Sequence, residues 1–436
     1  MSEYVELHAR SAFSFLEGAS VPEQLIAACA AHEMPAMALL DRDGVYGAAR
    51  FHLAAKKTGI RAHVGAEISV KSLGPKGSVV SIPLLVRNRT GYQNLCRLIT
   101  LMKLRVPKHA KAGECAVTLA ELTAHSEGLV CLTGGEDGPV ANALRSGGDA
   151  AKMAATVEWL LEVFGKGNVY AELQRHFNRH EEAQNQAVID LARRHRLPLL
   201  ATNGVCYASL FQREVADVFT CLRNHVRLET AGRLLARNSE TYLKPPRAMT
   251  EIFVDLPSAI ANTLELSARL DFTLEDLGYE FPKYPVPTGQ TMASFLRQRT
   301  VEGARLRYTG QNGSPAYESA CRQIERELQL IEKLKLEGYF LIVWDIIQFC
   351  RREGILVQGR GSAANSAVCY SLGITAVDPI GMELLFERFL SEERGEWPDI
   401  DLDLPSGDQR ERAIQYVYQR YGKLGAAMTA NVITYR

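Results

Sequence analysis

WPDIDLDL, residues 397–404, is the stretch of sequence that decides the fold of the second half of the chain. Acidic and apolar residues alternate in it, so on a strand Asp399, Asp401 and Asp403 project from one face. Mg²⁺ binds to one or two protein carboxylates together with substrate phosphates. Two such ions stabilise the in-line displacement at a phosphoryl group. On spacing alone, a solvated edge strand that carries acids by chance explains the pattern equally well.

A second segment, QGRGSAANS at residues 358–366, lies about 40 residues upstream of the acidic strand. It follows an apolar run and leads into a helix predicted from Ala363. Small residues and a helix start let backbone N–H groups approach an anion, and Arg360 and Ser362 add a cation and a hydroxyl. The alternative is a plain strand-to-helix turn. Together the two segments are the pairing expected of a nucleotidyltransferase.

The first half of the chain alternates short apolar strands with amphipathic helices, which indicates an α/β fold with mainly parallel strands. Ser20 is the predicted N-cap of the first helix. A Pro-rich stretch near residue 280 indicates a domain boundary. The predicted domains are residues 1–275 and 291–436, joined by a linker over 276–290. The predicted strands are 4–7, 36–40, 62–70, 128–132, 168–173 and 198–202, and the predicted helices are 22–32, 46–58, 149–164, 181–194, 292–308 and 316–336.

Composition limits the class of protein. The formal net charge is zero, which gives no support to nucleic-acid binding, because duplex-binding surfaces usually carry excess Lys and Arg. The nine cysteines form no CxxC pair and indicate reduced thiols in a cytoplasmic protein. Neither a signal peptide nor a long apolar run is visible, so we expect no contact with a membrane.

Four segments resemble the palm domain of C-family bacterial DNA polymerases, the alpha subunits of DNA polymerase III and their relatives. They are YEFPKYPVPTGQT (279–291), GYFLIVWDII (338–347), QGRGSAANSAVCYSLGITAVDP (358–379) and LLFERFLSEERGEWPDIDLDLP (384–405). Asn365 and the final NVITYR look most like the error-prone, damage-tolerance branch of that family. The resemblance implies a partial polymerase-β-like nucleotidyltransferase palm, truncated at the start of the thumb.

The resemblance also implies roles for individual residues. Gly361 and Ser362 would face the incoming triphosphate, and Asp401 and Asp403 would bind two Mg²⁺, with Asp399 the weaker candidate ligand. A third catalytic aspartate would lie beyond the chain. Phosphate contact and plain surface or structural pairing are equally open for three further residues: Arg360, Arg388 and Arg394.

The implied activity is template-directed deoxynucleotidyl transfer by the intact enzyme, with the fragment alone inactive. Implied partners are primer–template DNA, deoxynucleoside triphosphates, proteins of a damage-tolerance complex and a sliding clamp, the last two through regions outside this chain.

The first half resembles the PHP domain that opens these polymerases, a distorted (β/α)₇ barrel with a trinuclear metal cluster. His8, Glu17 and Glu67 match positions of that family's metal ligands. Six other ligand positions are changed, and guanidinium cannot ligate a metal. We therefore expect no cluster and a structural role, with a metal-dependent phosphoesterase (a 3′–5′ exonuclease) or a non-enzymatic scaffold as alternatives. The changed positions are Arg10, Arg42, Ser81, Gly135, Gly204 and Cys206.

Overall fold

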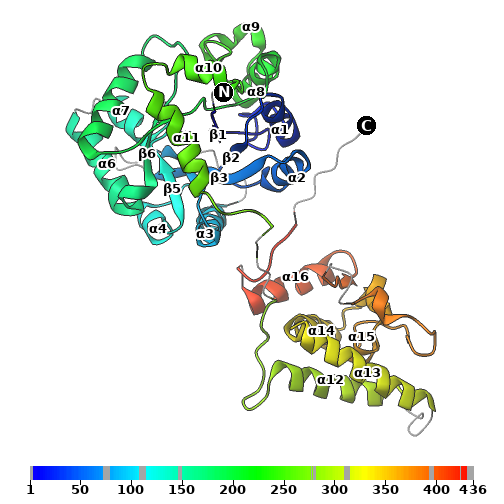
Figure 1. Ribbon diagram of the computed structural model, residues 1–436. Helices are drawn as coiled ribbons and strands as arrows, with labels where there is room; N and C mark the ends of the chain where they lie inside the picture. The colour runs from blue at the N-terminus through cyan, green and yellow to red at the C-terminus, as the bar shows by residue number, and fades with distance from the viewer. Residues whose placement is uncertain are drawn as a thin grey trace. The chain divides into compact units, whose positions relative to one another are not determined.

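The chain divides into two compact units, Met1–Leu277 and Gly278–Arg436, which are described separately below (Figure 1). The predicted linker, residues 276–290, spans this division, although 276 and 278–280 lie outside the described residues. None of the helices in the described part of the chain has the length and apolar composition of a membrane span. The computed structural model describes residues 3–71, 79–107, 114–145, 150–275, 277, 281–308, 315–391, 397–422 and 424–429.

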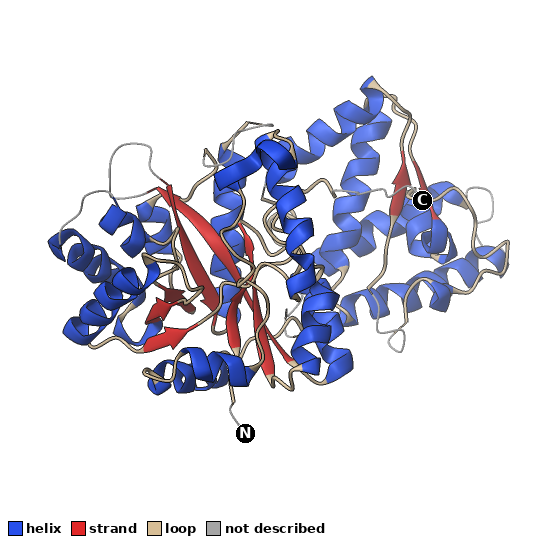
Figure 2. Ribbon diagram, turned by 90° about the horizontal axis from the view of Figure 1, so that it is seen from above, coloured by secondary structure: helices blue, strands red, loops and turns tan. Residues whose placement is uncertain are grey.

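The N-terminal unit is built on a curled seven-stranded sheet with the strands in chain order (Figure 2). Neighbouring strands are parallel except at β4, which runs antiparallel to β3 and β5. An isolated parallel bridge between Ala9 and Val205 links the segment after β7 back to β1. The strands are β1 (Glu6–Ala9), β2 (Ala36–Arg42), β3 (Arg61–Lys71), β4 (Val79–Val86), β5 (Leu129–Leu132), β6 (Val169–Leu173) and β7 (Leu199–Ala201).

Helices surround this sheet, which confirms the α/β class expected from the sequence (Figure 2). Most residues of β2 to β6 are buried because helices and the curled sheet cover both faces. The helices of this unit are α1 (Pro22–Ala31), α2 (Ala48–Thr58), α3 (Arg89–Arg105), α4 (Leu119–Ala124), α5 (Pro139–Arg145), α6 (Ala150–Phe164), α7 (Glu181–His195), α8 (Arg213–Asn224), α9 (Leu228–Ala231), α10 (Pro246–Ile252) and α11 (Pro257–Arg269).

The six predicted strands of this unit all overlap observed ones, whereas β4 has no counterpart among them. The predicted N-cap of α1 was wrong. Val21 holds that position, and the hydroxyl of Ser20 instead donates a hydrogen bond to Gln212 Oε1 at 2.6 Å. The side chain of Ser20, which the local sequence pattern predicted to cap the helix, therefore bonds to a residue far along the chain.

The C-terminal unit packs helices around a short antiparallel strand pair. In α13, Ile324, Leu328 and Ile331 lie at helical spacing and are buried in the core. The helix predicted from Ala363 begins only at Ala367, and a 3₁₀ turn covers Gly361–Asn365. The elements are α12 (Met292–Arg307), α13 (Pro315–Lys333), α14 (Glu337–Arg352), β8 (Gln358–Arg360), α15 (Ala367–Leu372), β9 (Asp401–Asp403) and α16 (Asp408–Tyr421).

Two candidate sites: an aspartate strand pair and a barrel pocket

Strands β8 and β9 place the predicted basic and acidic side chains opposite one another. Arg360 pairs with Asp401, and Gln358 pairs with Asp403. Directly opposed residues of an antiparallel pair project from the same face, so the two aspartates and Arg360 share one surface. Asp399 precedes β9 and is also exposed.

Both aspartates contact the same guanidinium group. Arg360 Nε donates to Asp403 Oδ1 at 3.0 Å, and Arg360 Nη1 lies 3.3 Å from Asp401 Oδ2. The hydrogen bond to Asp403, with the charges of both carboxylates, raises the pKa of Arg360. Because all three side chains are about half exposed, these ion pairs contribute little to stability. Their geometry shows instead that the two carboxylates converge on one cation position.

The turn after β8 lies beside this cation position. Gly361 has a φ of +73°, a conformation that favours glycine, and a Cβ at this residue would lie 4.0 Å from Asp401 Oδ2. The strand pair is fixed from both sides: Gly359 N donates to Ile374 O at 2.7 Å, and Ile400 N donates to the hydroxyl of Tyr339 at 3.0 Å. The predicted turn and the predicted acids therefore meet.

One of the other predicted phosphate contacts lies in a turn that contacts the turn Gly361–Asn365. Arg388 lies in a separate 3₁₀ turn, Phe386–Arg388, and Arg394 lies outside the described residues. At the start of α15, the N–H groups of Ala367 and Val368 donate hydrogen bonds to the carboxylate of Glu327.

The donor set of Asp401 and Asp403 fits a divalent cation. Two carboxylates on one strand face converge on a single positive group, and hard oxygen donors of this kind suit Mg²⁺. Within the described ranges, no group of three or more His, Cys, Asp or Glu side chains is arranged to hold a metal. Asp401 and Asp403 thus supply two ligands, and other ligands would have to complete the set.

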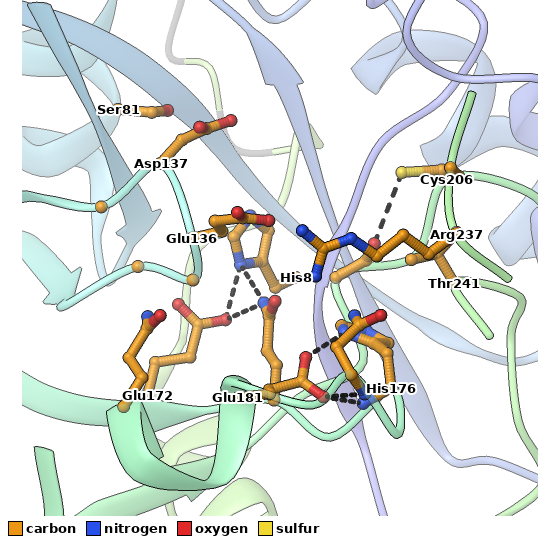
Figure 3. A pocket seen from close by; sticks show the side chains of 18 of the residues that line it. His8, Ser81, Glu136, Asp137, Glu172, His176, Glu181, Cys206, Arg237 and Thr241 are labelled. Atoms are coloured by element: carbon orange, nitrogen blue, oxygen red, sulfur yellow. Dashed lines mark hydrogen bonds and ion pairs between the residues drawn. The ribbon is translucent and has the colours of Figure 1, made fainter. Parts of the chain in front are cut away.

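The second candidate site is a pocket of about 450 Å³ in the N-terminal unit (Figure 3). His8, from β1, lies at its centre, and its Nδ1 lies 2.6 Å from Glu172 Oε1. Its Nε2 lies 2.7 Å from Glu67 Oε1. Seven of the nine positions compared with PHP metal ligands line this pocket: His8, Arg10, Glu67, Ser81, Gly135, Gly204 and Cys206.

Arginines provide positive charge beside the carboxylates of this pocket. Arg10 Nε donates to Glu67 Oε1 at 2.5 Å, and Arg42 Nη1 lies 3.5 Å from Glu67 Oε2. Glu17 joins the same network, 3.3 Å from Arg42 Nε and 3.7 Å from Arg10 Nη1. The hydroxyl of Ser81 donates to Glu67 Oε2 at 2.8 Å. The retained acids are therefore bound to the residues that replaced metal ligands.

Burial and charge set the protonation states in this network. Burial disfavours a charge on His8, but the carboxylates of Glu172 and Glu67 outweigh it and raise the pKa of His8 to about 10. Burial likewise opposes ionisation of Glu67, but Arg10 and His8 hold its pKa well below the usual range. Protonated His8 and the two arginines thus act as fixed internal cations.

Glu172 is the residue of this pocket that sequence reasoning missed. It has almost no exposed surface, and besides His8 it accepts a hydrogen bond from Gln174 Nε2 at 3.0 Å. A signal was available, because Glu172 is the only charged residue in the apolar strand Val169–Leu173. A buried acid needs a partner, and that partner is His8. His176, which also lines the pocket, contacts Glu181 and the carbonyl of Asn203.

Comparison with known proteins matches the two units to two family models. Residues 6–176 match the PHP domain, and residues 294–436 match the bacterial DNA polymerase III alpha NTPase domain. The palm and PHP resemblances drawn from the sequence are therefore confirmed. The matched ranges include both candidate sites, apart from residues that lie after position 176 in the barrel.

Similar curated proteins extend the match across the chain. An error-prone DNA polymerase of Mycolicibacterium paratuberculosis is 42% identical over 445 residues, which cover 99% of this chain and 39% of that protein. The error-prone DNA polymerase of Mycobacterium bovis is 41% identical over 437 residues, with coverages of 99% and 39%. Error-prone DNA polymerase 1 of Rhizobium meliloti is 39% identical, with coverages of 99% and 37%. The chain spans about two fifths of the length of these relatives.

Proposed function

We propose that the intact protein is an error-prone, DNA-directed DNA polymerase, because this chain matches the PHP domain and the bacterial DNA polymerase III alpha NTPase domain. It would add deoxynucleotides to a primer 3′ end and release pyrophosphate during synthesis past DNA damage. The observation that carries this proposal is the convergence of Asp401 and Asp403 on one cation position beside Gly361.

Asp401 and Asp403 are the proposed ligands of catalytic Mg²⁺, with a further carboxylate from outside this chain. A divalent cation bound there would stabilise the charge that develops on the transferring phosphoryl group. Backbone N–H groups of the turn at Gly361 and Ser362, with the Ser362 hydroxyl, bind triphosphate oxygens. Arg360, once released from the carboxylates, is placed to pair with the same phosphates, and Arg388 and Arg394 are further proposed contacts.

The barrel pocket is proposed to be structural. Its acids are paired with Arg10, Arg42 and His8, which leaves their oxygens poorly placed to ligate a metal cluster. These ion pairs weigh against the alternative function, a metal-dependent phosphoesterase or 3′–5′ exonuclease acting through His8, Glu17 and Glu67. A non-enzymatic scaffold is the remaining alternative.

Primer–template DNA and deoxynucleoside triphosphates are the proposed substrates of the intact protein, which we place in the cytoplasm. Proteins of a damage-tolerance complex and a sliding clamp are proposed partners, through regions outside this chain. DNA binding would depend on those regions because the chain has no net positive charge.

Primer extension by the full-length protein tests the proposal. We expect Asp401→Ala and Asp403→Ala each to slow extension roughly a thousandfold, equivalent to about 4 kcal/mol of transition-state stabilisation. Asp408→Ala, which removes an exposed acid at the start of α16, is the matched control and should extend at nearly the wild-type rate. Normal extension by the Asp401 and Asp403 variants would refute the site, and an inactive wild-type protein would favour the scaffold.

A further inference from the structure

Glu327 is a fully buried acid in the middle of α13 that the proposed chemistry does not use. Its carboxylate reaches the start of α15 instead of solvent. Oε2 accepts hydrogen bonds from the Ser366 hydroxyl at 2.7 Å and from Val368 N at 3.0 Å. Oε1 accepts from Ala367 N at 3.0 Å. Gln323 Nε2, one turn earlier in α13, donates to Oε1 at 3.0 Å.

The side chains of Glu327 and Ser366 accept hydrogen bonds from the first N–H groups of α15. Ala367 and Val368 donate to Glu327, and Cys369 N donates to the hydroxyl of Ser366 at 3.0 Å. The first N–H groups of a helix have no partner within the helix and carry partial positive charge. Glu327 satisfies two of them and places a negative group at this end, so a substrate phosphate has no place at the start of α15.

The turn that precedes α15 is the one that holds Gly361 and Ser362. Asn365 Nδ2 donates to Ser362 O at 2.9 Å, and the next residue, Ser366, is bound to Glu327. At its other end the turn continues from β8, which is tied to β9. The backbone from Gly361 to Asn365 is therefore held between a strand pair and a helix start anchored by one buried carboxylate.

We propose that Glu327 is a positioning residue for nucleotide binding, which fixes the Gly361–Ser362 turn and directs the triphosphate to that turn. This inference rests on the proposed polymerase function. Burial raises the pKa of Glu327, while the hydrogen bonds from Val368 and Ala367 oppose that rise. The carboxylate does not contact substrate. It acts through Ser366 and the first turn of α15.

Steady-state primer extension by the full-length protein carrying Glu327→Gln tests this role. The amide keeps the shape of the side chain but presents an NH₂ group to one of the two N–H donors. We expect the KM for the incoming deoxynucleotide to rise at least fivefold, with kcat within about twofold of wild type. A purely structural role would reduce kcat through loss of folded enzyme and leave KM unchanged.

Two further variants keep the test decisive. Glu332→Gln neutralises an exposed acid of the same helix and should leave KM unchanged. Ser366→Ala removes two hydrogen bonds, the one to Glu327 and the one from Cys369 N, and leaves the buried carboxylate in place. We expect a two- to threefold rise in KM even if Glu327→Gln fails to fold. Thermal melts of residues 1–436 report folding of each variant.

The outcomes separate the two proposals. A wild-type protein that extends no primer overturns the polymerase function itself. An active wild type with unchanged KM in folded Glu327→Gln and in Ser366→Ala overturns only the positioning role. A rise in KM in both, with the Glu332→Gln control unchanged, supports it.

Discussion

The barrel pocket and the strand pair both bring acidic side chains together, but they neutralise them differently. In the pocket, Glu67 is 1% exposed and is bound by His8, Arg10 and Arg42. On the strand pair, Asp401 and Asp403 are 46% and 61% exposed and share one exposed arginine. A buried acid needs a permanent partner, whereas an exposed acid can exchange its partner. The acids of the pocket are therefore suited to stabilising the fold of the N-terminal unit. The acids of the strand pair are suited to binding an external cation.

The largest effect that we expect from this difference between the two sites is a change in the free energy of unfolding. We expect Glu67→Gln to lower the free energy of unfolding of the N-terminal unit by about 3–5 kcal/mol, because it leaves His8, Arg10 and Arg42 with too little negative charge. Urea denaturation of the chain, followed by circular dichroism, measures this change.

The matched change on the strand pair is Asp403→Asn, which we expect to alter stability by less than about 0.5 kcal/mol, since exposed ion pairs contribute little. Equal losses in the two variants would contradict the distinction between the sites.

The pH dependence of the free energy of unfolding tests whether the pocket holds a permanent internal cation. The pKa of His8 is raised to about 10 in the folded protein, from an ordinary value of 6.5. Its contribution to stability is therefore complete below pH 6.5 and is lost as the pH rises toward 10. We expect the free energy of unfolding to fall by up to about 1.4 kcal/mol per pH unit across this window.

His8→Gln provides the control for this slope. Burial raises the pKa of Glu6 to about 7, and in the wild type this group titrates mainly below pH 7.5. The difference between wild type and variant from pH 7.5 to 9.5 therefore measures the effect of removing His8. A parallel decline in the two proteins would mean that His8 is not held as a cation.

Most of the fold could be predicted from the sequence because the strands of the barrel are short apolar runs between amphipathic helices. Strand β4 was missed because it follows β3 after only seven residues and pairs with it antiparallel, whereas the predicted pattern separates the strands by amphipathic helices. The start of α15 was placed four residues early, because small residues from Ala363 onward suit a helix equally well. Glu327, which marks the actual start, lies on a different helix.

The two sites differed in how much of each was predictable. Alternation along a strand could place Asp401 and Asp403 on one face, because local strand geometry sets their positions. Arg360 contacts them through the pairing of β8 with β9. In the pocket, the replacements Arg10 and Arg42 were identified, but Glu172 was missed. The curled sheet brings the side chain of Glu172 on β6 to within 2.6 Å of His8 on β1, although these strands are not neighbours in the sheet. No local pattern in the sequence encodes this contact.

Manganese titration of residues 1–436, with free Mn²⁺ measured by electron paramagnetic resonance, tests most directly which site binds an external cation. We predict that the wild-type chain binds Mn²⁺, that Asp401→Asn/Asp403→Asn removes this binding, and that Arg360→Gln strengthens it by removing a competing cation. Arg247→Gln, at an exposed arginine of the other unit, should change nothing. Unchanged binding in the double aspartate variant, or binding that Glu17→Gln abolishes, would contradict the account.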